Sequence, residues 1–483
     1  MKRVLLFSAG LLMAASSFAQ TTLWDGESYE LGSKGGCWDD GSPTVVANPD
    51  QTGINTSSKC LKFTMTSTDK VVKIPFRDWI KPNLNGARRI SLMIKKSTNE
   101  NVKIEVSDPT NDGATSYWEK VAAWYGGNGA WQKLVFDFST NTALNDYPGV
   151  ISITAQTGDV SANEDVYIDN VEVEAVPTVN GTALSSVTDA SLSGDLTLGG
   201  SWMKGSCSNA DNDTWTTVNY DDYSTLNAKL TAATTSIDTR NATLSDPYNA
   251  FGNTNPNIII YANSAFDANN VVAGGKIASL NMSEGYKFYA KEGFTADKVV
   301  LTRALVAGYN SVCLPFATTA GDLGATAIAR YTSTSESDGT TSVVFTKAES
   351  VDANVPFVTV GATASASQTF TNKSIVATPA SLADGNFVGI YEPTDAEGKW
   401  GLGDQKFQKG ASGATLNSFH AYLNNSSAAK INFTISGLTT GINNIKAADT
   451  KANEVYNLSG MLMTGKRLNK GIYIINHKKV IVK

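Results

Sequence analysis

The sequence is poor in the residues and motifs that most catalytic sites need. Its two histidines, His420 and His477, are far apart in the chain, and neither is accompanied by a GxSxG motif. Walker-type and dinucleotide-binding glycine loops are missing, as are CxxC pairs. Pairs of carboxylates arise by chance among 45 acidic residues, and no hydrolase signature surrounds any of them. We therefore expect a protein that is not an enzyme and that has no structural zinc site.

Charge and long apolar runs are also scarce. Charged residues make up 17% of the chain and the net charge is −6, without a patch rich in Lys and Arg, so nucleic acid is a poor partner. Beyond residue 19 no apolar stretch approaches the roughly 20 residues that a membrane-spanning helix needs. Runs with helical period are nearly absent, whereas Gly, Ser, Thr, Asn and Asp are abundant. This composition predicts an all-β chain with many turns, and the length predicts about three domains.

The four cysteines are scattered along the chain. Only Cys37 and Cys60 fall within one expected domain, so they are the one candidate disulfide pair. The alternative is that these two residues, with Cys207 and Cys313, are buried small apolar side chains.

The first residues have the pattern of a cleavable signal peptide. Two basic residues precede an apolar run at residues 4–15, and Ser17 and Ala19 occupy the −3 and −1 positions of a cleavage site before Gln20. No cysteine follows the run at the cleavage point, so a lipoprotein anchor is not supported. We expect an exported protein, either secreted or held at the outer-membrane surface.

Residues 20–176 alternate apolar and polar side chains in short runs. Such runs between polar turns predict a two-sheet sandwich with half-buried strands. The clearest runs are residues 60–65, 90–94, 102–106, 134–138 and 166–173.

Several motifs make this domain resemble the carbohydrate-binding jelly rolls of Bacteroidetes and, more distantly, galactose-binding-like sandwiches. They are LWDGE at residues 23–27, NPDQTGINTS at 48–57, WQKLVFDFS at 131–139 and YIDNV at 167–171. The resemblance implies a jelly-roll sandwich that binds sugar. Related jelly rolls often hold a structural calcium ion between the first and last strands, and Glu27 and Asp169 occupy the matching positions. The alternative is that both carboxylates are solvated.

Two further resemblances concern the rest of the chain. Residues 177–300 predict a β-rich module with one short helix within residues 221–232, capped by Asp221. In the module at 301–440, the segment GYNSVCLPF at 308–316 resembles a signature of adhesin-like Bacteroidetes surface modules. Residues 441–483 predict a small module of three strands, and VYNLSG with KGIYII and KKVIVK resembles the sorting domain of type IX secretion. This resemblance implies contact with secretion machinery.

Tryptophan is concentrated in the first domain, which contains six of the nine tryptophans of the chain. An exposed aromatic ring offers a flat apolar surface to the C–H face of a sugar, while polar neighbours bind the hydroxyl groups. Trp124 and Tyr125 cannot both point inward on an extended strand, so one of them should be exposed. The alternative is that the rings fill the sandwich core. The candidate glycan-binding residues are Trp38, Trp118, Trp124, Tyr125, Arg77 and Asn128.

These patterns together predict a non-catalytic, secreted or surface protein whose first sandwich binds a glycan or polysaccharide. One alternative is a structural, adhesin-like protein that interacts with host or matrix proteins. The other is a polysaccharide-degrading enzyme of an unfamiliar family.

Overall fold

The computed structural model shows an all-β chain, as the composition predicted. The chain forms two compact units, Met1–Thr434 and Ile435–Lys483. In the described part the one α-helix is α1 (Asp222–Asn227), and Asp221 caps it by accepting a hydrogen bond from Ser224 N. None of the helices in the described part is long and apolar enough to cross a membrane. The structure describes residues 21–37, 42–75, 89–107, 119–139, 150–188, 192–211, 214–247, 249–251, 255–337, 340–425, 427–438, 455–457, 463, 470–475 and 478–482.

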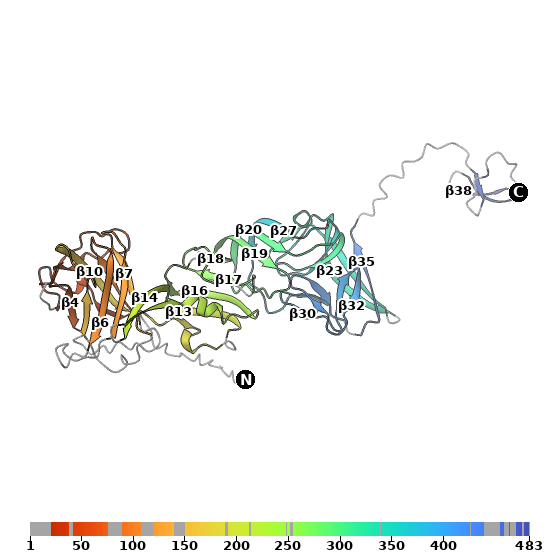
Figure 1. The fold of residues 1–483 in the computed structure, drawn as a ribbon. Helices are drawn as coiled ribbons and strands as arrows, with labels where there is room; N and C mark the ends of the chain where they lie inside the picture. Colours follow the sequence, from red (N-terminus) through yellow and green to blue (C-terminus); the bar gives the residue numbers. More distant parts are fainter. Residues whose placement is uncertain are drawn as a thin grey trace, which may run out of the picture. The chain divides into compact units, whose positions relative to one another are not determined.

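The N-terminal part is a sandwich of two antiparallel six-stranded sheets (Figure 1). The first has the order β2-β3-β10-β5-β8, with β1 paired to β10, and the second has the order β15-β14-β7-β6-β9-β4. The strands of the first are β1 (Thr21–Trp24), β2 (Thr44–Ala47), β3 (Lys59–Met65), β5 (Arg89–Lys95), β8 (Gln132–Asp137) and β10 (Glu164–Val173). Those of the second are β4 (Val71–Pro75), β6 (Glu100–Ser107), β7 (Glu119–Tyr125), β9 (Val150–Thr154), β14 (Lys204–Asp211) and β15 (Thr214–Asp221).

The sandwich extends beyond residue 176, the domain boundary predicted from the sequence. Strand β14 pairs with β7 through Ser208, Asn209 and Ala210, so the β14–β15 strand pair widens the second sheet. Its inward side chain Cys207 joins the same hydrophobic core as Val121 of β7. Cross-strand pairing and a shared core therefore make this later segment part of the first sandwich.

The next sheet has nine strands and several parallel pairs. Its order is β12-β11-β13-β16-β17-β18-β19-β20-β27, in which β13/β16, β16/β17, β17/β18 and β19/β20 are parallel. Buried asparagines support the connections between these strands. For example, Asn257 Nδ2 donates to the carbonyls of Ser283 and Tyr286. The strands are β11 (Thr178–Val179), β12 (Thr182–Ala183), β13 (Gly194–Trp202), β16 (Thr234–Leu244), β17 (Ile259–Ala262), β18 (Val271–Ala273), β19 (Lys276–Ser283), β20 (Phe294–Thr302) and β27 (Gln368–Ile375).

Two five-stranded sheets follow, with the orders β21-β26-β23-β24-β35 and β28-β29-β34-β31-β32. The rings of Phe345, Phe387, Phe407 and Phe433 pack together with centroids 5.2–6.2 Å apart. The strands are β21 (Gly308–Val312), β23 (Ala327–Ser337), β24 (Thr340–Ala348), β26 (Phe357–Ala362), β28 (Ala383–Asp384), β29 (Phe387–Gly389), β31 (Trp400–Gly403), β32 (Lys406–Lys409), β34 (Ala421–Leu423) and β35 (Lys430–Ser436). Two small ladders join β22 (Thr318–Thr319) to β25 (Ser350–Val351) and β30 (Thr394–Asp395) to β33 (Thr415–Leu416).

The C-terminal unit contains the three strands that the sequence predicted. They are β36 (Val455–Asn457), β37 (Gly471–Ile475) and β38 (Lys478–Val482), which form one antiparallel sheet.

The disulfide that the sequence suggested between Cys37 and Cys60 is not formed. Both are free, buried thiols, and the Cys37 Sγ lies 3.6 Å from the carbonyl oxygen of Gly35. Burial raises the pKa of the Cys37 thiol to about 12; burial, with the nearby charge of Asp169, does the same for Cys60. Cys207 and Cys313 are also free and buried, so the alternative of small apolar side chains describes all four.

A thiol titration checks this finding. We expect four thiols to react with Ellman's reagent when the protein is denatured without reductant, and we expect reductant to leave the melting temperature unchanged. A count of two thiols would show that a disulfide forms in the protein.

Candidate functional site

The second sheet of the sandwich has an inner and an outer face, and strand β7 shows how they alternate. Val121, Ala123 and Tyr125 point into the core, while Ala122 and Trp124 point outward. Trp124 is 56% exposed, although it lies directly beside a fully buried tyrosine. The prediction that one member of the Trp124–Tyr125 pair is exposed is therefore confirmed.

Tyr125 itself cannot contact a glycan, so its prediction as a binding residue is wrong. Its hydroxyl lies 2.7 Å from the carbonyl oxygens of both Lys96 and Ala130, and it accepts a hydrogen bond from Lys96 N. Burial raises the pKa of Tyr125, which keeps this hydroxyl neutral and hydrogen-bonded. Strand alternation gives Trp124 to the surface and Tyr125 to the core.

A second exposed tryptophan, Trp215 of β15, lies on the same outer face. Residues that oppose each other in neighbouring antiparallel strands share a face, and Lys120 opposes Ala210, which in turn opposes Trp215. Lys120 shares its face with Trp124, four residues along β7. Trp215 is 45% exposed. The Cα atoms of Trp124 and Trp215 are separated by two strand spacings across the sheet and by four residues along it. This corresponds to a distance of about 16 Å.

Polar side chains form the outer face between Trp124 and strand β4. Lys103 and Glu105 of β6 make an ion pair of 2.7 Å, and Ser152 and Thr154 of β9 oppose them in the ladder. Ser152 is only 2% exposed, and its hydroxyl has no hydrogen-bond partner among the described residues. This face therefore combines two flat apolar rings with polar and charged groups, since Lys73 opposes Ser152 and Lys120 opposes Glu105 on the same face.

The remaining predicted glycan contacts have other places. Asn128 is exposed, but its side chain belongs to the turn after β7, where it adopts a φ of 47°. Asn99 Nδ2 donates to Asn128 Oδ1 at 2.6 Å, and Asn128 N donates to Asn99 Oδ1 at 3.1 Å. Trp38, Arg77 and Trp118 lie outside the described residues.

Trp215 is the residue that sequence reasoning missed. The run TWTTVNY at residues 214–220 alternates, with Val218 and Tyr220 packed on the core and Trp215 exposed. This alternation was a readable signal for the exposure of Trp215. Its place in the first sandwich has no local signal, because that depends on pairing with β7 about 90 residues earlier in the chain.

The two carboxylates predicted to hold calcium bind N–H and O–H groups instead. Asp169 is fully buried and accepts hydrogen bonds from Gly26 N, Asn55 Nδ2 and Asn170 N. Asn55 Oδ1 accepts from Ser57 N, which fixes the orientation of that amide. Donor hydrogens pointing at a carboxylate leave no place there for a cation.

The other half of the expected calcium site is filled by a lysine. Glu27 accepts hydrogen bonds from Ser58 Oγ at 2.9 Å and from Lys59 N at 2.9 Å. The Lys59 Nζ lies 3.3 Å from the carbonyl oxygen of Glu27 and 2.7 Å from that of Tyr29. An internal ammonium group thus binds the carbonyls that a calcium ion would need. Among the described residues no group of three metal-ligating side chains is found, and this arrangement does not fit a calcium site.

Thermal unfolding with and without calcium tests this conclusion. We expect the same melting temperature in EDTA and in millimolar calcium. Asp169→Asn should lower the free energy of unfolding by about 1–3 kcal/mol, because an amide group would face the donors that now bind the carboxylate. A calcium-dependent rise in melting temperature that is lost in Asp169→Asn would show that the protein does bind calcium at this position.

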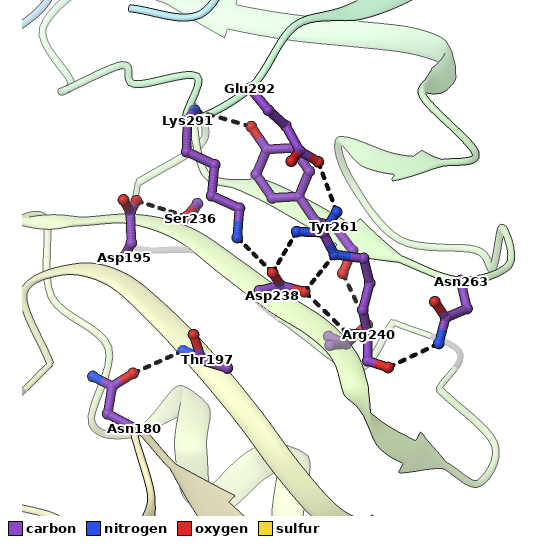
Figure 2. Close-up of polar contacts among 11 residues, drawn as sticks. Asn180, Asp195, Thr197, Ser236, Asp238, Arg240, Tyr261, Asn263, Lys291 and Glu292 are labelled. Atoms are coloured by element: carbon purple, nitrogen blue, oxygen red, sulfur yellow. Dashed lines mark hydrogen bonds and ion pairs between the residues drawn. The ribbon is translucent and has the colours of Figure 1, made fainter. Parts of the chain in front are cut away.

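A cluster of charged residues lies where the pairing between the parallel strands β16 and β17 ends, at Asp238 and Tyr261, and Figure 2 shows its contacts. Arg240 binds Asp238 at 2.6 Å and Glu292 at 2.9 Å, and Lys291 also donates to Asp238. Burial raises the pKa of Asp238, but the hydrogen bonds from Arg240 and Lys291 outweigh this effect and hold it well below the usual range.

This cluster does not provide the acid–base pair of a glycosidase. Asp238 binds two cations, which favours its ionised form over that of a proton donor, and one guanidinium group holds both carboxylates. Lys291 N donates to the hydroxyl of Tyr261 at 3.2 Å. The cluster therefore connects the segment between β19 and β20, which contains Lys291, to strand β17. A pocket of about 210 Å³ beside Arg240 is the space left next to these ion pairs.

Comparisons with known proteins give neighbours of the fold only. No protein-family model and no curated protein matches the sequence. One similar solved structure is of carbohydrate-binding modules from the β-sandwich superfamily, solved to explain their promiscuous specificity. It is 16% identical to this chain, with a TM-score of 0.23. The match covers 32% of this chain and 62% of that chain, less than two thirds of its length.

Two further neighbours are complete modules of the same kind. The family 11 carbohydrate-binding module from Clostridium thermocellum, solved with a β-1,3-1,4-mixed-linked tetrasaccharide, is 12% identical with a TM-score of 0.22, over 32% of this chain and 94% of that chain. A family 30 carbohydrate-binding module is 11% identical with a TM-score of 0.20, over 33% and 95%. At these identities and TM-scores the likeness carries no argument about a ligand of this chain.

Proposed function

We propose that this protein binds a glycan without modifying it, and that the outer face of the second sandwich sheet is the binding surface. The observation that carries the proposal is the presence of two exposed indole rings, Trp124 and Trp215, on one face of one sheet. Isolated exposed apolar residues need no explanation, but two large aromatic rings on a shared polar face indicate a surface kept for a ligand.

The chemistry of this face favours a neutral, hydroxyl-rich ligand. Its central charges, Lys103 and Glu105, neutralise each other at 2.7 Å, so the centre of the face offers both donors and acceptors. An anionic polymer such as a nucleic acid would instead require unpaired cations.

The alternatives receive less support. An adhesin-like surface in the module at 301–440 would gain from exposed aromatic rings near residues 309–316 or at Trp400, but Phe316 and Trp400 are buried. A degradative enzyme would gain from two free carboxylates facing each other across a cleft, whereas Asp238 and Glu292 are bound to one arginine. In our proposal the signal peptide and the tail at 441–483 bring this glycan-binding protein out of the cell, to the medium or the outer surface.

A glycan array probed with the full chain tests the proposal. We expect binding to at least one neutral polysaccharide or oligosaccharide, and a clear loss of that signal in Trp124→Ala. Ile54→Ala is the matched control, because Ile54 is an equally exposed apolar residue of the same sandwich at 57% exposure, outside the second sheet. The proposal fails if the wild type binds nothing, or if Trp124→Ala and Ile54→Ala give the same signals as the wild type.

A further inference from the structure

A cleft among the described residues lies far along the chain from the tryptophan face. It has a volume of about 420 Å³, which is within the range of pockets that bind small ligands. Its floor includes Tyr422 of β34 and Val388 of β29, which oppose each other in the ladder and so share a face. Tyr289, Lys287 and residues 378–382 form the walls.

The aromatic groups of this cleft are held in place by their surroundings. Lys399 Nζ lies 5.6 Å from the centroid of the Tyr422 ring, over its face, and donates to the carbonyl oxygen of Asp395 at 2.7 Å. Burial raises the pKa of Tyr422, so its hydroxyl stays neutral. Tyr391 is fixed beneath by a 2.8 Å hydrogen bond to Asn354. The cleft is therefore preformed rather than assembled by its ligand.

The charges at the rim indicate what kind of ligand fits. The ammonium of Lys287 and the carboxylate of Glu392 are 2.9 Å apart, and both are partly exposed. An anionic ligand would have to displace Glu392, and a cationic one would have to displace Lys287. A neutral ligand keeps the pair and can use both of its ends as donor and acceptor.

We infer that this cleft is a second saccharide-binding site, which takes roughly one or two sugar rings of a neutral glycan. Tyr422 and Tyr289 supply aromatic surface for the sugar C–H groups, and the Lys287–Glu392 pair binds hydroxyl groups at the rim. This site has no residue in common with the Trp124 face, so each can exist without the other.

The test uses a glycan array of neutral mono-, di- and oligosaccharides with the full chain. We expect some signals to persist in the Trp124→Ala/Trp215→Ala variant and to fall at least tenfold in Tyr422→Ala, while Tyr422→Phe, which keeps the ring, retains them. Tyr286→Ala is the matched control, because Tyr286 is 40% exposed and lies outside the cleft lining. Ser381→Trp, an exposed position at the wall, should block the cleft without removing the floor.

The outcomes separate this inference from the proposed function. If Tyr422→Ala and Ser381→Trp keep every wild-type signal while the double tryptophan variant loses them all, the cleft is not a saccharide site and the tryptophan face stands alone. If the tryptophan variant keeps all signals and the cleft variants lose them, the proposed binding face is wrong and the cleft remains. If the wild type binds no saccharide, both fail.

Discussion

Replacing both Trp124 and Trp215 with alanine should abolish glycan binding at the outer face of the second sandwich sheet, and this is the largest functional effect that we expect. A ring that anchors a ligand contributes about 2 kcal/mol, which corresponds to roughly 30-fold in affinity. The two residues are about 16 Å apart, beyond the distance at which substitutions usually influence each other. Their effects should therefore multiply to about 1000-fold, which would leave no detectable binding at this face at micromolar protein.

The separation also predicts a dependence on glycan length. A monosaccharide can contact only one of the two rings, whereas a chain that spans the distance can contact both. Isothermal titration of the array hit and its shorter fragments should show a step in affinity at the length that reaches the second ring. In Trp215→Ala this step should disappear, while the affinity for the shortest fragments stays that of the wild type.

One result of these titrations would contradict a binding face that Trp124 and Trp215 share. If Trp124→Ala alone removes binding and Trp215→Ala has no effect at any glycan length, then β15 does not take part in the site. Ile54→Ala should match the wild type throughout, and a loss in this variant would show that the assay reports general destabilisation.

Features of this site that depend on neighbouring residues could be predicted from the sequence. Features that depend on segments far apart in the chain could not. The alternation along β7 determines that Trp124 and Tyr125 face opposite ways, and this follows from strand geometry alone. Which of the two is buried depends on whether a partner is available, and the carbonyl oxygens of Lys96 and Ala130 bind the tyrosine hydroxyl. The contribution of Trp215 depends on a pairing between distant segments, which no local pattern encodes.

The calcium prediction shows a different limit. The positions of Glu27 and Asp169 were correct in the sense that both lie near the junction of the first and last strands, where Asp169 contacts Gly26. What the motif could not show is the position of Lys59, whose Nζ binds the carbonyl oxygens of Glu27 and Tyr29. A ligand motif gives the acceptors, while the identity of the cation depends on side chains outside the motif.

Arg89→Met should cause the largest loss of stability. Arg89 is 8% exposed and donates to Asp137 at 2.7 Å and to Asp222 at 2.6 and 3.0 Å. Its guanidinium also lies 4.7 Å from the centroid of the Tyr220 ring in β15. Removing this cation would leave two buried carboxylates unpaired, which costs about 3–5 kcal/mol. For a domain of this size the melting temperature should fall by about 10 °C in calorimetry.

Lys62→Met is the matched control for this substitution. Lys62 and Asp165 form a 2.8 Å ion pair in the same sandwich, but their side chains are 35% and 43% exposed. Because exposed pairs contribute about 0–1 kcal/mol, this variant should melt within a few degrees of the wild type. Equal melting temperatures for Arg89→Met and Lys62→Met would show that the buried network contributes no more than a surface pair.

The Arg89 network should also affect the glycan site, since Asp222 directly follows β15. Without Arg89 the β14–β15 strand pair keeps its ladder to β7 but loses two contacts of its end with the first sheet, the Arg89–Asp222 ion pair and the packing of Arg89 on the Tyr220 ring. We therefore compare hydrogen exchange in Arg89→Met and in the wild type by mass spectrometry. The increase in exchange rate should be larger in peptides from 204–221 than in peptides from β6. The affinity of Arg89→Met for long glycans should fall toward that of Trp215→Ala, because a mobile β15 no longer presents its indole. Unchanged exchange at 204–221 would mean that pairing with β7 alone holds Trp215 in place.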